Sequence, residues 1–131
     1  ILMLNYYMQK KIKICIKNFE IIVRLRNTKT AEIIWDSLPI KSKTQTWGEE
    51  VYFFVPLSSD LDEDAKDVLN FGEIAYWSSG KAIVIGFGKT PLSYKDEIRL
   101  ADKCNIWGDT EFNLKKLKII KSGELIEVKR C

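Results

Sequence analysis

The stretch Gly72–Pro91, G-E-I-A-Y-W-S-S-G-K-A-I-V-I-G-F-G-K-T-P, is the most informative part of this 131-residue chain. It contains two short runs, Glu73–Trp77 and Lys81–Phe87, that are rich in the β-branched and aromatic residues typical of strands. Gly80 and Gly88 follow these runs, where a left-handed backbone or a close backbone approach requires a residue without a side chain. The segment therefore predicts two short strands bounded by turns.

The N-terminal side of this segment predicts a hairpin and a helix. Polar and apolar residues alternate in Lys11–Lys17 and again in Glu20–Arg26, which is the pattern of half-buried strands joined by a turn. Thr30 is then placed to cap a short helix over Ala31–Leu38, and Pro39 ends it.

The remaining segments add further strands and a second helix. Strands are predicted over Glu49–Val55, covered on both faces, and over Asp67–Asn70, Lys103–Trp107 and Leu125–Lys129, whereas Lys89–Lys103 is predicted to be a long surface loop. Asn113 or Thr110 caps a final helix with one apolar face, and Gly123 follows it as the left-handed residue. Its apolar face comprises Leu114, Leu117 and Ile120. About eight short strands and two short helices predict a mainly β protein, a closed barrel with helices at its ends.

Composition bounds the class of protein. The hydrophobic fraction of 46% and the charged fraction of 30% are those of an ordinary globular protein, and we expect one domain over residues 11–131 after an extended or disordered tail over residues 1–10. Three scattered cysteines indicate free thiols in a reducing cytoplasm. A net charge of +3 with few arginines does not point to nucleic acid, and the apolar start is too short to span a membrane. Heavy isoleucine and lysine usage is compatible with a thermophile or with an AT-rich genome.

Two motifs that imitate cofactor or metal sites fail on spacing. Gly88-Lys89-Thr90 matches the end of a phosphate-binding loop, but the first glycine of that motif is replaced by Ile83, and Pro91 forbids the helix that should follow. The acidic run Asp60–Asp64 lacks the glycine and the final glutamate of a calcium loop. A chain without histidine and without paired cysteines offers no zinc site, and Cys104 has no imidazole base nearby in sequence. We therefore expect no cofactor and no metal.

Five short motifs in a fixed order resemble one family, that of the small, functionally uncharacterised prokaryotic cyclophilin-like domains. They are Thr46–Phe53, Tyr76-Trp77, Gly80–Ala82, Phe87–Pro91 and Asn105–Gly108. The resemblance covers most of the chain beyond about Lys11, and it implies a cyclophilin-like closed eight-stranded β-barrel with two short helices. Ser78-Ser79 stands where the family usually has two prolines.

The resemblance also implies what a prolyl isomerase would need, and the chain lacks it. Cyclophilins use an arginine beside the prolyl carbonyl together with a histidine-containing cleft, whereas this chain has no histidine and no arginine between Arg26 and Arg99. In the corresponding region it has Trp47-Gly48-Glu49-Glu50, whose carboxylates would repel a carbonyl oxygen. We therefore expect no classical prolyl isomerase activity.

The aromatic residues near the turns suggest a groove for a small molecule or an extended peptide. Its predicted walls and rim are Trp47, Glu49, Tyr52, Tyr76, Trp77, Lys81, Phe87 and Thr90. Glu49 and Glu50 are adjacent in a strand and point to opposite faces, so only one of them can face a shared pocket. Packing in the core of a small barrel is the competing interpretation of the aromatics.

Three function classes remain open at this point. The first is a binding protein without classical isomerase activity, the second is a divergent prolyl isomerase, and the third is a subunit of a larger complex or a homo-oligomer. We expect neither a nucleic acid nor a membrane as the partner.

Overall fold

A computed structural model of the chain describes residues 9–131. The predicted hairpin is confirmed: β1 (Lys11–Ile16) pairs antiparallel with β2 (Phe19–Leu25), with Ile14 opposite Ile21. Ile12, Ile14 and Ile21 are fully buried because alternate side chains of both strands face the same interior. The tail expected over residues 1–10 lies almost entirely outside the described residues, and the assignment of residues 11–131 to one domain stays a prediction.

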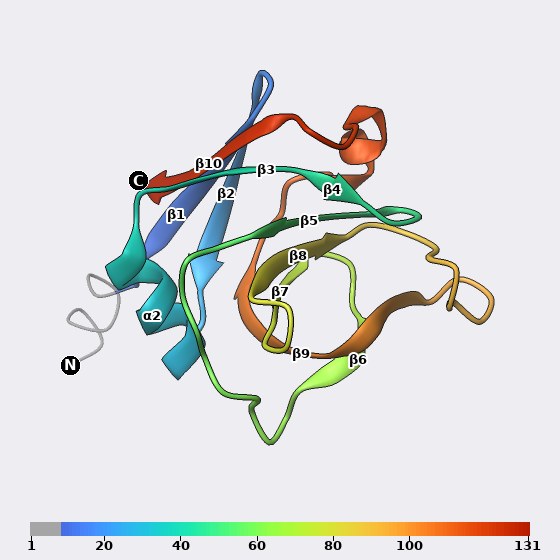
Figure 1. Cartoon of the computed structure of the whole chain (residues 1–131), viewed down its shortest axis with the longest axis horizontal. Helices are drawn as coiled ribbons and strands as arrows, with labels where there is room; N and C mark the ends of the chain where they lie inside the picture. The colour runs from blue at the N-terminus through green and yellow to red at the C-terminus, as the bar shows by residue number, and fades with distance from the viewer. Residues whose placement is uncertain (1–8) are drawn as a thin grey trace.

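The sheet closes into a barrel through an interrupted strand over residues 40–46, which the sequence did not indicate. β10 (Leu125–Arg130) pairs with β1 and with β3 (Ile40–Lys43), and only Thr44 separates β3 from β4 (Gln45–Thr46). The strand order is β3-β10-β1-β2-β9-β7-β8-β5-β4, so its two ends belong to one continuous segment. With β3 and β4 taken as one interrupted strand and β6 set aside, eight strands enclose the barrel (Figure 1), as predicted.

The central strands agree with the sequence except in one region. They are β5 (Glu50–Phe54), β6 (Lys66–Leu69), β7 (Glu73–Trp77), β8 (Ala82–Gly86) and β9 (Ile98–Asp109). The loop predicted over Lys89–Lys103 is wrong, because β9 already begins at Ile98. Leu100 in this part of β9 is 2% exposed, so burial of alternate side chains forms a strand despite the charged residues between them.

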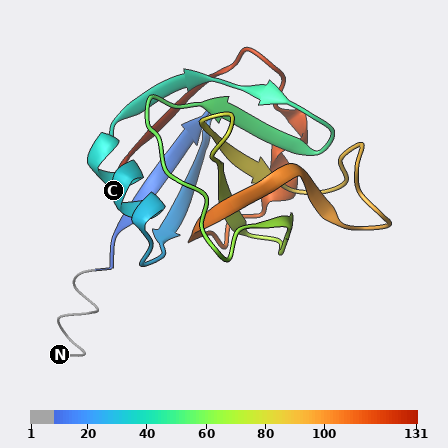
Figure 2. The same ribbon diagram turned by 60° about the horizontal axis from the view of Figure 1, so that its bottom comes forward.

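Two helices lie at opposite ends of the barrel (Figures 1 and 2). α2 (Lys29–Ser37) begins after Thr28, whose hydroxyl accepts a hydrogen bond from the Ala31 amide, so the prediction of Thr30 as the cap is wrong by two residues. The second is the 3-10 helix η1 (Leu114–Ile119), which Asn113 caps as predicted. Leu114 and Leu117 seal its end of the barrel, whereas the lysines of η1 remain exposed.

Two separate apolar clusters result from this arrangement. The larger one fills the barrel and includes Phe53, Tyr76 and Trp107. The smaller one lies on the outer face of β7 and β8. The first half of β9 covers it, together with β6, which pairs with β9. Its buried members are Leu69, Ala75, Val84, Ile98, Leu100, Cys104 and Ile106. β9 therefore closes the barrel with one half and covers the outside of the sheet with the other (Figure 1).

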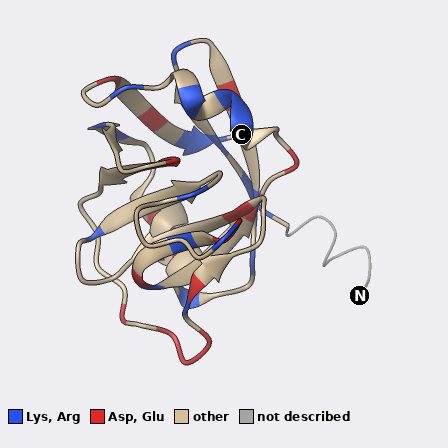
Figure 3. Ribbon diagram, turned by 90° about the vertical axis from the view of Figure 1, so that its right-hand side faces the viewer, with Lys and Arg blue, Asp and Glu red and all other residues tan. Residues whose placement is uncertain are grey.

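Charged residues are interspersed along the chain in the view of Figure 3, where the loop between β5 and β6 projects with its acidic residues. One group of charges lies at the base of β7. The Arg26 guanidinium bonds to Asp109 at 2.7 and 2.8 Å and to Glu73 at 2.9 Å, and Lys66 reaches the other oxygen of Glu73 at 2.7 Å. Neither helix of residues 9–131 has the length and apolar character that a membrane-crossing helix requires.

Candidate functional site

A cavity of about 250 Å³ opens beside the smaller apolar cluster. Its floor is formed by Glu50 on β5, Val84 on β8, and Leu100 and Cys104 on β9. Half-buried aromatic side chains form the walls, and exposed residues of β9 form part of the rim. The walls are Trp47, Tyr52 and Trp77, and the rim residues are Ala101 and Asp102.

Strand alternation decides which side chains reach this cavity. On β5, Glu50 and Tyr52 line the cavity, whereas Val51 and Phe53 point into the barrel. On β7, Trp77 lines the cavity, whereas the fully buried Tyr76 belongs to the barrel core. The cavity is therefore an outer-face feature of the barrel wall.

Two glycines allow the elements around the cavity to come close together. A Cβ atom on Gly86 would lie 2.6 Å from Ile98 Cγ2, so only glycine lets β9 cross β8 at this distance. A side chain on Gly80 would overlap the ring of Trp77, which lies against the backbone of the turn after β7. Gly80 thus meets the prediction of a close approach at that position.

Trp47 is held at the cavity by a turn that docks on the loop after β8. Gly48 has a φ of +57°, and its backbone packs directly on Lys89 and Thr90. The Glu49 amide donates to the Lys89 carbonyl at 2.8 Å, and the Glu49 carboxylate accepts a hydrogen bond from the Lys89 amide at 3.1 Å. The Trp47 amide then bonds to the Glu50 carbonyl at 3.0 Å, which keeps Trp47 beside Glu50.

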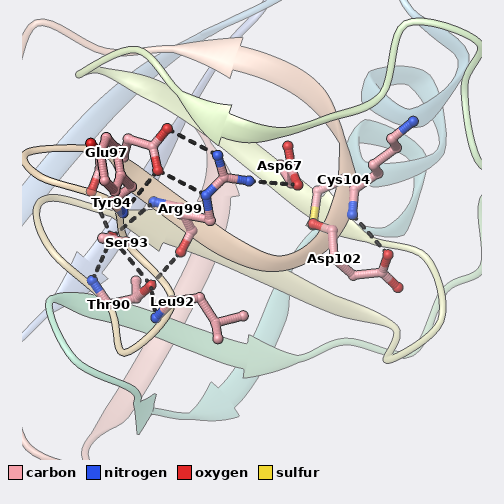
Figure 4. Close-up of polar contacts among 10 residues, drawn as sticks. Asp67, Thr90, Leu92, Ser93, Tyr94, Glu97, Arg99, Asp102 and Cys104 are labelled. Atoms are coloured by element: carbon pink, nitrogen blue, oxygen red, sulfur yellow. Dashed lines mark hydrogen bonds and ion pairs between the residues drawn. The ribbon is translucent and has the colours of Figure 1, made fainter.

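The loop between β8 and β9 is braced by a compact hydrogen-bond network (Figure 4). The hydroxyl of Thr90 donates to the Arg99 carbonyl, and the Ser93 hydroxyl donates to the Glu97 carbonyl at 2.7 Å. The Arg99 guanidinium bonds to both oxygens of Glu97 at 2.8 and 2.9 Å and to Asp67 at 3.0 Å. The start of β9 is thereby fixed, and the cation of Arg99 is occupied by carboxylates of its own neighbourhood.

Two lining residues, Glu50 and Trp77, have a buried polar atom without a hydrogen-bond partner among residues 9–131, and Glu50 is the one that can ionise. Its side chain is 5% exposed, and its Oε1 atom has no hydrogen-bond partner among residues 9–131. Burial raises the pKa of Glu50 to about 7, because no cation lines the cavity to stabilise the carboxylate. A buried polar atom without a partner is rare in proteins and costs stability. Glu50 therefore presents an unsatisfied carboxyl group to the interior of an aromatic cavity.

The Cys104 thiol at the cavity floor is not a nucleophile. Burial raises its pKa to about 12, and the charges of Glu50, Asp102 and Asp67 act in the same direction. Since the thiolate is the reactive form of cysteine, a thiol with this pKa reacts only slowly near neutral pH. These three carboxylates also favour a negative electrostatic potential at the floor.

The structure brings together some of the predicted site residues and separates the others. Trp47, Tyr52 and Trp77 line the cavity. The remaining predicted residues serve in turns or in the core: Glu49 bonds to the Lys89 amide, Lys81 forms an exposed turn with a φ of 52°, Tyr76 and Phe87 are in the barrel core, and Thr90 bonds to Arg99. They do not line the cavity.

The sequence-based prediction placed Glu49 rather than Glu50 in the groove, although the two-residue period of a strand distinguishes them. Residues two apart on a strand share a face, so Tyr52 and Glu50 must face the same side and Glu49 the other. The contribution of Leu100 and Asp102 had no such signal, because both lie in the segment predicted to be a loop, and Cys104 in the predicted strand Lys103–Trp107 was interpreted as a core residue. Among residues 9–131, no three His, Cys, Asp or Glu side chains converge as a metal site would require.

Comparisons with known proteins agree with this architecture. The model of the cyclophilin-like family matches residues 10–129. The chain belongs to the cyclophilin-like family. The solution structure of the hypothetical protein AF2241 from Archaeoglobus fulgidus is similar, with 38% sequence identity, a TM-score of 0.79, and coverage of 94% of this chain and 95% of that one. No curated protein sequence matches the chain.

Membership of the cyclophilin-like family confirms the recognition made from the five motifs and the barrel predicted with it. The similar archaeal structure is that of a hypothetical protein, so the family supplies the fold and leaves the activity to the chemistry of the site.

Proposed function

We propose that this cyclophilin-like protein binds a small organic molecule in the cavity between β5, β7 and β9. The observation that supports it most is the buried, unpartnered Oε1 of Glu50 at the floor of a cavity with three aromatic walls. Binding sites for small molecules are mostly apolar, with a few polar groups that orient the ligand. A ligand that bonds to Glu50 would remove the cost of leaving that atom unsatisfied.

The size of the cavity favours a compact ligand. A volume of about 250 Å³ lies below the roughly 300–1,000 Å³ of sites that enclose drug-sized molecules. It suits a small metabolite or one side chain of an extended peptide. The exposed ring of Phe54 stacks edge-on with Tyr52 at 5.8 Å and would continue an aromatic surface for such a peptide beyond the rim.

A divergent prolyl isomerase is the alternative enzyme. It would rely on apolar walls alone, because no arginine lines the cavity, and the guanidinium groups of Arg26 and Arg99 are bonded to carboxylates elsewhere. A turnover assay on Ala-Pro peptides decides between these two functions. A rate equal to the uncatalysed rate at high protein concentration rejects the isomerase.

A subunit of a larger complex is the other alternative. The solution molar mass and a pull-down from native extract address it, since a constitutive partner or a homo-oligomer would shift the mass above the 15.2 kDa of the chain. Binding of a small molecule to the isolated protein would show that the site is complete without a partner.

The test of the proposed function is an NMR screen of the protein against a metabolite library and Xaa-Pro peptides. We expect shifts of the Trp47 and Trp77 indole signals, loss of binding in Trp47→Ala and Trp77→Ala, and unchanged binding in the control Trp35→Phe. Trp35 serves as the control because it packs on Arg130 at 4.3 Å, on α2 and away from the cavity. If no compound perturbs Trp47 or Trp77, or if the perturbed signals lie elsewhere, the proposal is wrong.

A further inference from the structure

The charge around the cavity has one sign. Among residues 9–131, the charged side chains that line it are the carboxylates Glu50 and Asp102. Asp67, on the neighbouring strand β6, is paired with Arg99 at 3.0 Å, so these two charges largely offset each other. The nearest described arginine of β9, Arg99, is bound to Glu97 and Asp67 and does not line the cavity. An anionic ligand would meet repulsion here without a compensating cation.

The aromatic walls have the same preference. Trp47, Tyr52 and Trp77 come from three separate segments and surround the cavity together with Glu50. The faces of aromatic rings carry a partial negative charge and attract ammonium groups, most strongly for tryptophan and in sites shielded from water. A carboxyl group on the floor and two tryptophans in the walls are the components of a site for an organic cation.

A neutral ligand would use this arrangement less well. It would leave Glu50 without a counter-charge, so the carboxyl group would have to stay protonated in the complex. A cation instead stabilises the carboxylate and removes the need for that proton. A positive charge from outside the chain would therefore stabilise the ionised carboxylate, which no lining side chain of residues 9–131 does.

We propose that the natural ligand is a small organic cation, an ammonium or alkylammonium group that contacts Glu50 and is enclosed by Trp47, Tyr52 and Trp77. This inference rests on the proposed function and adds the chemical class of the ligand. It assigns Glu50 the role of the binding counter-ion, and it assigns Asp102 at the rim a supporting, more solvated role.

The test compares cations with neutral molecules of the same shape. Choline and butylamine are the cationic probes, and 3,3-dimethylbutan-1-ol and butan-1-ol are their neutral counterparts. At pH 8 we expect each cation to bind at least about tenfold more tightly than its counterpart, as one desolvated cation–π contact and one ion pair would give. The readout is the indole signals of Trp47 and Trp77 in an NMR titration.

Two variants and a pH series locate the charge that discriminates. Glu50→Gln keeps the shape of the side chain and should remove the preference for cations while leaving the affinity for the neutral probes unchanged. Glu49→Gln is the matched control, because Glu49 faces the other side of β5 and bonds to the Lys89 amide. In the unmodified protein, the affinity for the cations should fall below about pH 7, where Glu50 becomes protonated, and the affinity for the neutral probes should not.

The outcomes separate this inference from the proposed function. If the neutral probes bind at Trp47 and Trp77 as tightly as the cations, the cation inference is overturned and the binding site stands. If Glu50→Gln retains the full preference for cations, Glu50 is not the counter-ion and the inference is overturned as well. If neither cation shifts the two indole signals up to its solubility limit, the cation inference fails, and the metabolite screen decides the proposed function separately.

Discussion

Two buried glutamates on neighbouring parts of one sheet have opposite surroundings. Glu73 on β7 is 7% exposed and Glu50 on β5 is 5% exposed. The carboxylate of Glu73 accepts hydrogen bonds from Arg26, Lys66 and the Asn70 amide, whereas Oε1 of Glu50 accepts none within residues 9–131. Both residues are largely buried, and they differ chiefly in the number of partners.

The pKa values of the two carboxyl groups move apart for that reason. Burial by itself would raise the pKa of Glu73, but the hydrogen bonds from Lys66, Asn70 and Arg26 outweigh it, and the pKa lies below its usual value. For Glu50, burial acts alone and raises the pKa to about 7. A buried carboxylate that the chain supplies with cations stabilises the fold, whereas one that faces a cavity without a cation is available to a ligand.

The largest effect is expected when Glu73 is deprived of its arginine. Arg26→Met removes the bonds to Glu73 and Asp109 and leaves part of their charge buried, so we expect a loss of about 3 kcal/mol in the free energy of unfolding. Urea denaturation measures it. Arg24→Met is the control, since Arg24 pairs only with the exposed Glu111 and should lose less than about 1 kcal/mol. Equal losses in the two variants would contradict a structural role for Glu73.

A smaller effect of opposite sign is expected at Glu50. A carboxyl group with a raised pKa in the folded state destabilises the protein as pH rises from its unfolded pKa of about 4.5 to its folded value of about 7. Glu50→Gln resembles the protonated acid at every pH, so it should match the unmodified protein at pH 4 and exceed its stability above pH 7. We expect a gain of about 2 kcal/mol, since each pKa unit corresponds to about 1.4 kcal/mol and water at the open mouth screens part of the charge.

Urea denaturation at pH 4 and pH 8 measures this gain. Glu49→Gln, whose side chain bonds to a backbone amide outside the cavity, should show no such pH-dependent difference. A Glu50→Gln variant that is less stable than the unmodified protein at pH 8 would mean that the carboxylate has a partner and would remove the contrast with Glu73.

The smallest effect is expected on the reactivity of the Cys104 thiol, whose pKa depends on the charge of Glu50. The charge of Glu50 helps to raise the pKa of Cys104, and Glu73 is not among its causes. Glu50→Gln should therefore speed the alkylation of Cys104 about threefold at pH 8, as a modest fall in thiol pKa would give. Mass spectrometry of iodoacetamide-treated protein measures the rate, with the exposed Cys131 as the internal reference. An unchanged rate would show that the Glu50 charge does not reach the cavity floor.

The sequence predicted the elements whose side chains alternate plainly and missed those that depend on tertiary packing. Lys11–Lys17 and Glu20–Arg26 were recognised because every second residue is apolar and faces the barrel. Ile98–Leu100 escaped notice, since the charged residues around it conceal the alternation until β6 is seen to pair there. The interrupted strand around Thr44 lacked any local signal, because its pairing with β10 lies far away in the chain.

The site was predicted in part, for a related reason. The three aromatic walls were found from composition near turns, and the choice between Glu49 and Glu50 required only the strand period. Apart from Val84 on β8, the remaining lining residues come from β9, whose position depends on the approach permitted by Gly86. The ion group of Arg26, Glu73 and Asp109 was beyond sequence reasoning, because its members are 47 and 83 residues apart.

The pairing of β1 with β10 also has a consequence for synthesis on the ribosome. The hairpin of β1 and β2 is translated long before β10, so Ile16 can pair with Ile126 only after the segment between them has been translated. During that interval the free edge of β1 is open to pairing with other nascent chains, and the lysines of β1, Lys11 and Lys13, are the kind of residue that discourages it. The barrel can close only after β10 has been translated, so we expect folding of the barrel to be slow.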